Sequence, residues 1–142
     1  MRVVTFNANG LRSAARKGFF SWFARQRADV LCVQELKAHD EQIADRAFHA
    51  RGYDRVCAHA EKRGYSGVAI YARKEPDRAE LGLGIADIDA QGRYLQLDYG
   101  NLSVVSIYLP SGSSGGEAQA RKFAFMKRFL PRLQAMRASG RE

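Results

Sequence analysis

The amino-acid sequence predicts an α/β fold, in which helices pack on a β-sheet. Short apolar runs typical of strands alternate with segments whose apolar residues recur at helical spacing, so the first 50 residues are expected to run strand, helix, strand, helix. The chain has 142 residues, enough for one domain with a core and too few for two ordinary ones. Its hydrophobic fraction of 46% and aromatic fraction of 11% are those of a globular protein.

The first strand is expected over residues 1–6, as a buried strand that ends at turn-forming asparagines. Ser13 can then cap a helix over residues 13–27, in which three aromatic residues recur at helical spacing: Phe19, Trp22 and Phe23. Residues 30–33 are a short, unbroken apolar run, which indicates a second buried strand.

Asp40 can cap a second helix, with Ile43, Ala47 and Phe48 on one face and Gly52 just past its end. Residues 53–59 and 67–72 are expected to form two strands around a polar loop.

Residues 93–99 alternate, with Leu95, Leu97 and Tyr99 on one face of the expected strand. Gly100-Asn101 then predicts a two-residue hairpin turn into a strand over residues 102–109. A last helix is expected over residues 117–138, burying Phe125, Phe129, Leu133 and Met136.

The charge balance favours a polyanionic partner. Lys and Arg number 23 against 15 Asp and Glu, a formal net charge of +8. No apolar run approaches the roughly 20 residues of a membrane span, and the N-terminal residues lack the apolar stretch of a signal peptide. We therefore expect a cytoplasmic protein with no membrane partner, whose Cys32 and Cys57 are free thiols.

A carboxylate follows the second strand, in the stretch DVLCVQELK. Glu35 stands at a strand end, where open α/β sheets place their sites, and Asn7 ends the neighbouring strand on the same edge. An amide beside a carboxylate is a suitable oxygen environment for a hard cation such as Mg²⁺. The alternative is a simple surface pair between Glu35 and Lys37.

Two basic loops and a strand-end tyrosine are further candidates. Arg12, Arg16 and Lys17 lie around a helix start and suit phosphate contacts, or form a solvated helix face. Tyr65 lies between glycines in RGYSG, where it can pack on a sugar or base, or cover a hairpin tip. Tyr108 ends the last strand. The histidines, His39, His49 and His59, are spaced by ten, which fits no metal-ligand pattern on one helix or strand, and are interpreted as surface or packing residues.

Several of these blocks occur in the order found in one enzyme family. VTFNANGLR, ADVLCVQELK, RGYSGVAIYAR, QGR and IYLPSG together resemble the exonuclease III family of abasic-site (AP) DNA-repair endonucleases, within the endonuclease/exonuclease/phosphatase superfamily. ADVLCVQELK is the most specific block, because it joins an Asp at the strand start to Gln-Glu-x-Lys at its end.

The resemblance implies the N-terminal half of a four-layer, DNase I-like α/β sandwich, with two packed mixed sheets flanked by helices. It implies hydrolysis of the phosphodiester 5′ to an abasic site and trimming of DNA 3′ ends, with Mg²⁺ or Mn²⁺ as cofactor. Glu35 and Asn7 would hold the metal, and Tyr108 would contact the scissile phosphate. The expected DNA contacts are Arg12, Ser13, Arg16, Lys17, Gly64, Tyr65 and Arg93.

The family pattern is matched only in part. Some members have Asp at the position of Asn9, and the Gly-Asp-x-Asn block and later Asp and Asp-His positions are expected beyond Glu142. Residues 1–142 are therefore expected to be one incomplete domain, inactive alone. A sheet face left bare by the missing half would favour a homodimer or a swap of elements.

Two alternatives to an exonuclease III-type nuclease remain. One is another metal-dependent phosphodiesterase or phosphatase of the same superfamily, and the other is a non-catalytic DNA-binding fragment.

Overall fold

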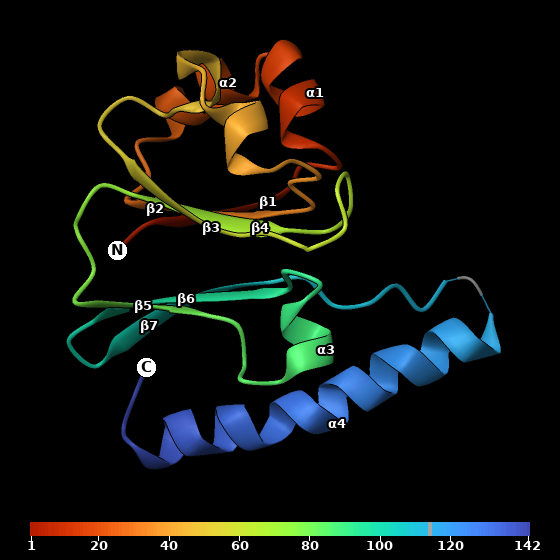
Figure 1. Cartoon of the computed structure of the whole chain (residues 1–142). Coiled ribbons are helices and arrows are strands. Elements are labelled where there is room, and N and C mark those ends of the chain that lie inside the picture. The colour runs from red at the N-terminus through yellow and green to blue at the C-terminus, as the bar shows by residue number, and fades with distance from the viewer. Residues whose placement is uncertain (114) are drawn as a thin grey trace.

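The computed structural model describes residues 1–113 and 115–142, and its layers run helices, sheet, sheet, helix (Figure 1). The larger sheet has four strands in the order β1-β2-β4-β3, and the smaller has three in the order β5-β6-β7. This confirms the predicted sandwich of two packed sheets. None of the helices in these residues is both long and apolar enough to cross a membrane.

The first strands pair in parallel, β1 (Val3–Asn7) with β2 (Val30–Gln34). The predicted helix between them is divided into α1 (Leu11–Arg16) and α2 (Phe19–Gln26). Gly18, with φ of +86°, separates the two, because a residue in the left-handed region ends one helix and redirects the chain. The predicted cap at Ser13 is wrong, since Gly10 occupies the N-cap of α1.

The predicted helix from Asp40 is also wrong. Two 3₁₀ helices take its place, η1 (Asp40–Ile43) and η2 (Arg46–Phe48), separated by extended backbone at Asp45. Asp45 accepts a hydrogen bond from the Ala47 amide (2.7 Å), so a local side-chain contact interrupts the longer helix.

The next two strands form as expected. They are β3 (Asp54–Ala58) and β4 (Val68–Ala72), which pair antiparallel, and β4 also pairs antiparallel with β2. The larger sheet is therefore mixed.

Two elements were not predicted from the sequence: β5 (Arg78–Leu81), which is a strand of the smaller sheet, and the one-turn helix α3 (Ala86–Asp89), which follows it. The other strands of the smaller sheet, β6 (Tyr94–Tyr99) and β7 (Leu102–Ile107), form the predicted hairpin through Gly100 and Asn101.

Two apolar layers hold the molecule together. One lies between the larger sheet and α1 and α2, and includes Phe23 and Leu31. The other lies between the sheets, where the predicted inward face of β6, with Leu95 and Leu97, packs on residues of β2 and β4. Both cysteines are free, Cys32 within the inter-sheet layer and Cys57 half-buried in β3.

The first strand is an edge strand rather than a buried one. Its residues alternate between exposed and half-buried, and Val3 is 48% exposed. Val4 and Phe6 pack toward the helices, whereas Val3 and Thr5 remain exposed. In the larger sheet the exposed surface lies at β1, since the smaller sheet packs on β2, β3 and β4.

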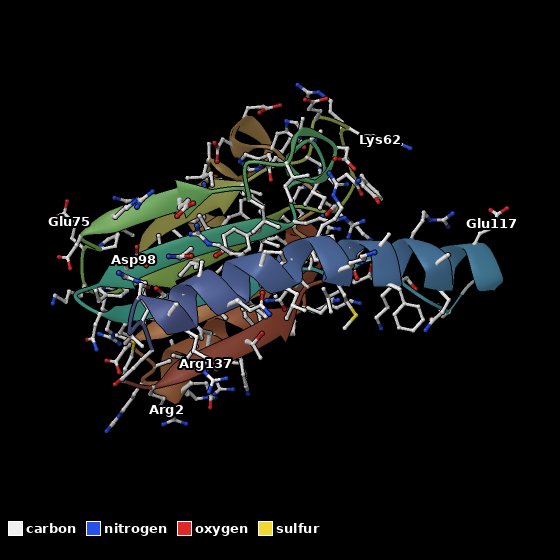
Figure 2. All side chains as sticks on the ribbon, turned by 90° about the horizontal axis from the view of Figure 1, so that it is seen from below. Arg2, Lys62, Glu75, Asp98, Glu117 and Arg137 are labelled. Atoms are coloured by element: carbon white, nitrogen blue, oxygen red, sulfur yellow. The ribbon has the colours of Figure 1, made fainter. Side chains whose placement is uncertain are left out.

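The last helix, α4 (Gly116–Ala138), crosses the outer face of the smaller sheet, and its Glu117 end extends past the strands (Figures 1 and 2). Phe125 is buried against the sheet, and Phe129 and Met136 are partly buried. The predicted burial of Leu133 is wrong, because this side chain is 46% exposed.

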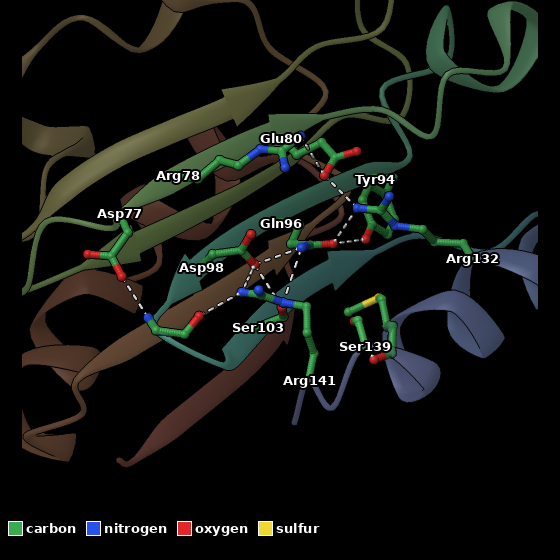
Figure 3. A network of polar contacts seen from close by, with 12 residues as sticks. Asp77, Arg78, Glu80, Tyr94, Gln96, Asp98, Ser103, Arg132, Ser139 and Arg141 are labelled. Carbon is green, nitrogen blue, oxygen red and sulfur yellow. Dashed lines mark hydrogen bonds and ion pairs between the residues drawn. The ribbon is translucent and has the colours of Figure 1, made fainter.

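Polar contacts attach the C-terminal half of α4 to the outer face of β6 (Figure 3). Arg132 donates to Glu80 and to Gln96 (3.0 Å), and Arg141 pairs with Asp98 (2.9 Å). Arg132 makes these contacts from α4 and Arg141 from the residues that follow it, whereas Leu133 is exposed. Hydrogen bonds to charged groups, rather than apolar area, therefore hold this end of the helix.

Candidate functional site

Three loops meet at one edge of the larger sheet, and backbone hydrogen bonds join them. The parallel register pairs Asn7 with Gln34, so β1 and β2 end side by side. The Gly10 amide then donates to the Glu35 carbonyl (2.8 Å), and the Lys37 amide donates to the Ser66 carbonyl (2.9 Å). The loops after β1, after β2 and before β4 therefore form one connected surface.

Glu35 lies at the centre of this surface. Its carboxylate accepts a hydrogen bond from Asn7 Nδ2 (2.8 Å) and pairs with Lys37 Nζ (3.0 Å). Lys37 Nζ also donates to Asn9 Oδ1 (2.6 Å), and the Asn9 amide donates to Asn7 Oδ1 (3.0 Å). The predicted neighbours Asn7 and Glu35 are thus brought together, and the alternative pair of Glu35 with Lys37 is present as well.

Left-handed backbone concentrates in the same loops. Five non-glycine residues of the described chain have positive φ, and four of them lie here: Asn9 (42°), Glu35 (55°), Lys37 (48°) and Ser66 (48°). Each such conformation costs roughly 1–3 kcal/mol outside glycine, and asparagine tolerates it best. The backbone hydrogen bonds between the loops hold these conformations in place.

The ionisation of Glu35 follows from its neighbours. Partial burial raises the pKa of its carboxyl, but hydrogen bonds from Asn7, Lys37 and Tyr108 and the charge of Lys37 outweigh burial and hold the pKa below its ordinary value. Glu35 is therefore an anion at neutral pH.

Arg93 joins two tyrosines beside Glu35. This side chain is only 4% exposed, and it donates to the Tyr108 carbonyl (3.0 Å) and to the Tyr65 hydroxyl (2.7 Å). Its guanidinium also lies over both rings, 5.0 Å from the centroid of Tyr108 and 5.7 Å from that of Tyr65. Gln91 accepts from Arg93 Nε (2.9 Å), so the guanidinium is fixed from several sides.

The Tyr108 phenol faces the carboxylate. Burial raises the pKa of Tyr108, the hydrogen bond to Glu35 and the charge of Glu35 raise it further, and Arg93 opposes them. The phenol therefore keeps its proton at neutral pH and can donate a hydrogen bond.

Four of the predicted DNA contacts line one hollow of about 440 Å³: Arg12, Ser13, Arg16 and Gly64. Lys37 lines the same hollow, which connects it to the Glu35 side. Tyr65 is 39% exposed beside it, whereas Arg93 is buried and, with Tyr65, lines a separate hollow of about 250 Å³. Lys17 lies apart, on a hollow of about 510 Å³ with Phe19 and Trp22.

The donors at Glu35 suit a hard cation, because they are carboxylate and amide oxygens. Among the described residues Glu35 belongs to no group of three His, Cys, Asp or Glu ligands, since the one such group is Asp40, Cys57 and His59. Asn7 and Glu35 could thus hold one side of a Mg²⁺ or Mn²⁺ ion.

Sequence reasoning missed two contributors, Asn9 and Gln91. Asn9 enters the sequence analysis only as a departure from the family pattern, yet it accepts a hydrogen bond from Lys37 (2.6 Å). Gln91 accepts a hydrogen bond from Arg93 (2.9 Å), and its place in the family-like QGR block could have identified it as a site residue.

The chain is similar in sequence to several nucleases. Residues 4–139 match the endonuclease/exonuclease/phosphatase family. The chain is 34% identical over 118 residues to an exodeoxyribonuclease of Bacillus subtilis, covering 82% of this chain and 46% of that protein. It is 32% identical over 138 residues to exodeoxyribonuclease III of Haemophilus influenzae, covering 94% and 50%.

The fold has close structural counterparts. An AP endonuclease from Archaeoglobus fulgidus superposes with a TM-score of 0.81 and 28% identity, covering 95% of this chain and 51% of that one. The chain therefore spans about half the length of the relatives that it matches.

Proposed function

The chain belongs to the endonuclease/exonuclease/phosphatase family, and from this premise we propose that the protein acts as a metal-dependent DNA-repair nuclease of the exonuclease III type. The reaction is hydrolysis of the phosphodiester 5′ to an abasic site and removal of nucleotides or blocking groups from 3′ ends. The observation that carries the proposal is the convergence of Asn7, Glu35 and Tyr108 beside a basic hollow. The names of the relatives, exodeoxyribonuclease and AP endonuclease, support it.

Glu35 and Asn7 would hold a divalent cation, Mg²⁺ or Mn²⁺. When bound, such an ion polarises a phosphoryl oxygen and lowers the pKa of a bound water. Glu35 suits this role because its carboxyl is ionised at neutral pH. Lys37, 3.0 Å from Glu35, places a second positive charge where a phosphate would approach.

Tyr108 supplies a neutral hydrogen-bond donor next to the carboxylate. A fixed donor stabilises negative charge that develops on the phosphoryl oxygens, because it is already oriented before the reaction. Arg93 is a positioning residue, since it holds the Tyr108 backbone and the Tyr65 hydroxyl from a buried position.

DNA binding is assigned to the basic hollow and to Tyr65. Arg12, Arg16 and Lys37 offer three cations around one cavity, which suits successive phosphates of a backbone. The open space around Gly64 allows a sugar-phosphate backbone to approach closely. The exposed ring of Tyr65 can pack on a sugar.

The binding test uses the 142-residue chain and a fluorescent duplex with an abasic site. Arg12→Ala and Arg16→Ala should each reduce the slope of log affinity against log salt by about 0.9, because each removes one phosphate contact. Arg25→Ala is the matched control, since this exposed arginine of α2 does not line the hollow. Equal effects of all three variants would assign binding to net charge and contradict the proposed surface.

The cleavage test uses the same duplex with Mg²⁺ or EDTA, and any longer polypeptide that the reading frame encodes. Glu35→Gln should lower cleavage at least about 100-fold, because it removes the anionic ligand. Glu41→Gln, an exposed glutamate that pairs with Arg63 (2.8 Å), should leave it unchanged. Full activity of Glu35→Gln would remove Glu35 from the mechanism.

The 142 residues alone are proposed to lack activity, because among the described residues Glu35 belongs to no group of three His, Cys, Asp or Glu side chains that could hold a metal. DNA binding without cleavage by the longer polypeptide would instead support the non-catalytic alternative. Release of phosphate from small phosphomonoesters, with no action on DNA, would support the phosphatase alternative.

A further inference from the structure

A second cluster of metal-ligating side chains lies outside the site described above. Asp40 opens η1, Cys57 belongs to β3, and His59 follows the end of β3. One ligand atom from each lies within 4.8 Å of the others. The spacing of the histidines in the sequence does not indicate this cluster, because its three members come from separate segments that meet only in the folded chain.

The ring of His59 is oriented as in many metal-binding histidines. Its Nδ1 lies 2.9 Å from the Ala38 carbonyl oxygen, and since a carbonyl can only accept, Nδ1 carries the proton. The lone pair of the neutral ring is therefore on Nε2. A backbone carbonyl that fixes the tautomer in this way is the usual outer partner of a histidine ligand.

Nε2 of His59 is buried and has no hydrogen-bond partner among the described residues. Asp40 Oδ1 is 3.1 Å away, yet its approach does not have hydrogen-bond geometry. In its neutral form the ring presents a lone pair to a carboxylate oxygen, and these two acceptors repel each other unless a proton or a metal cation lies between them. The ring is also held by stacking on His39, with centroids 5.3 Å apart.

Cys57 adds a sulfur ligand. It is a half-buried free thiol, and burial raises its pKa to about 12 although the nearby Arg55 opposes this. Binding to a metal deprotonates a thiol, so thiolate and carboxylate together would balance a divalent charge. Arg55 is the cation that faces the cluster, with its Nη2 3.8 Å from Asp40, and its Nη1 donates to the Ile43 carbonyl (3.0 Å).

We propose that Asp40, Cys57 and His59 bind one zinc ion, with water as the fourth ligand. Thiolate with imidazole favours zinc over magnesium or calcium. Tetrahedral zinc places such ligand atoms about 3.3–3.6 Å apart. The 3.1 Å between Nε2 and Oδ1 is already close to this spacing, and the remaining pairs, which lie within 4.8 Å, need to approach by at most about 1.5 Å.

This ion would connect η1 to β3. Since η1 begins three residues after Lys37, the metal would anchor the far end of the loop that carries Glu35 and Lys37. The ligands differ from those at Glu35, so the inference stands whether or not the protein is a nuclease.

The test is titration of the metal-free, reduced 142-residue chain with Co²⁺ as a spectroscopic substitute for zinc. We expect saturation at one ion per chain, visible bands of tetrahedral cobalt, and a near-ultraviolet band from thiolate-to-cobalt charge transfer. Zinc should then displace the cobalt and abolish these bands. Absence of saturable uptake would overturn the proposal and leave a plain ion pair between a protonated His59 and Asp40.

Matched variants identify the ligands. Cys57→Ser should abolish the charge-transfer band, whereas Cys32→Ala, at the other free cysteine, should retain it. Asp40→Asn tests the site even if the Cys57 variant fails to fold, because the Asp40 side chain is 71% exposed and its substitution should leave the fold intact. We expect this variant to bind the metal more than about 10-fold more weakly. His49→Ala should leave binding unchanged. A charge-transfer band that survives Cys57→Ser, or unchanged affinity in Asp40→Asn, would refute the assignment.

Discussion

Gly92 makes a close backbone approach that an added methyl group should disrupt. A Cβ at this position would lie 2.4 Å from the His59 carbonyl carbon, 2.6 Å from the Ala60 nitrogen and 2.7 Å from the Ala58 oxygen. These are backbone atoms at the end of β3, so they cannot move aside as a flexible side chain would. The φ of Gly92 is also +56°, which disfavours any side chain.

The cost of Gly92→Ala therefore has two parts. The left-handed conformation costs an alanine about 1–2 kcal/mol, and forcing atoms into a packed site costs about 1–3 kcal/mol. A total of about 2–5 kcal/mol is a large share of the 5–15 kcal/mol that stabilises a typical domain. With a urea m-value of about 2 kcal/mol/M, the unfolding midpoint should fall by about 1–2.5 M.

Gly18→Ala measures the conformational part alone, so its difference from Gly92→Ala gives the steric part. Gly18 has a φ of +86°, but a Cβ there would meet nothing within 4 Å. Its substitution should cost only the conformational part, about 1–2 kcal/mol. The assay is urea unfolding of both variants and the parent, followed by circular dichroism. Equal midpoints for the two variants would show that the close contact at Gly92 contributes nothing, and the reasoning would be refuted.

Three further predictions concern side-chain contacts. Lys37→Met should raise the pKa of Glu35, which NMR titration of the carboxyl group checks. Because the folded-state pKa of Glu35 lies below its unfolded value near 4.5, Glu35 stabilises the fold above that pH, and this stabilisation is lost as the pH falls. The Lys37→Met variant should therefore lose less stability in acid than the parent. The pKa of Tyr108 should lie above its ordinary value of 10, and Glu35→Gln should lower it, because Glu35 contributes to the shift. The titration of Tyr108 is obtained from phenolate absorbance as the difference between the parent and Tyr108→Phe. Arg132→Met should accelerate amide hydrogen exchange in the C-terminal half of α4 about 10-fold, because it removes a charged hydrogen bond of about 1.4 kcal/mol. Substitution of the exposed Arg137 by Met is the control and should leave exchange unchanged. Unchanged exchange in Arg132→Met would contradict the polar attachment of α4.

Much of the fold followed from local patterns. The unbroken run of β2 and the alternation of β6 each gave the right strand, because their burial depends on periodicity that the sequence displays. The helix predicted from Ser13 was divided because the backbone at Gly18 redirects the chain. β5, with exposed or half-buried side chains, shows little apolar pattern and is defined by its pairing with β6.

The candidate site was predictable where it depends on strand ends. Asn7 and Glu35 could be placed together because parallel neighbours end at the same edge. The burial of Arg93 between Tyr65 and Tyr108 could not be predicted, since it depends on how the smaller sheet packs against a loop of the larger one. The cluster around Cys57 was invisible for the same reason.

The four left-handed residues around Glu35 have a consequence for how the protein can change. Glycine at Glu35 or Lys37 would relax the backbone, yet it would remove the charge on which the proposed function depends. Selection for heat resistance alone would therefore be expected to accept changes at these positions early, whereas selection for activity would resist them. The opposition between thermal tolerance and function is thus localised to a few residues of three short loops, and engineering for stability should begin elsewhere in the chain.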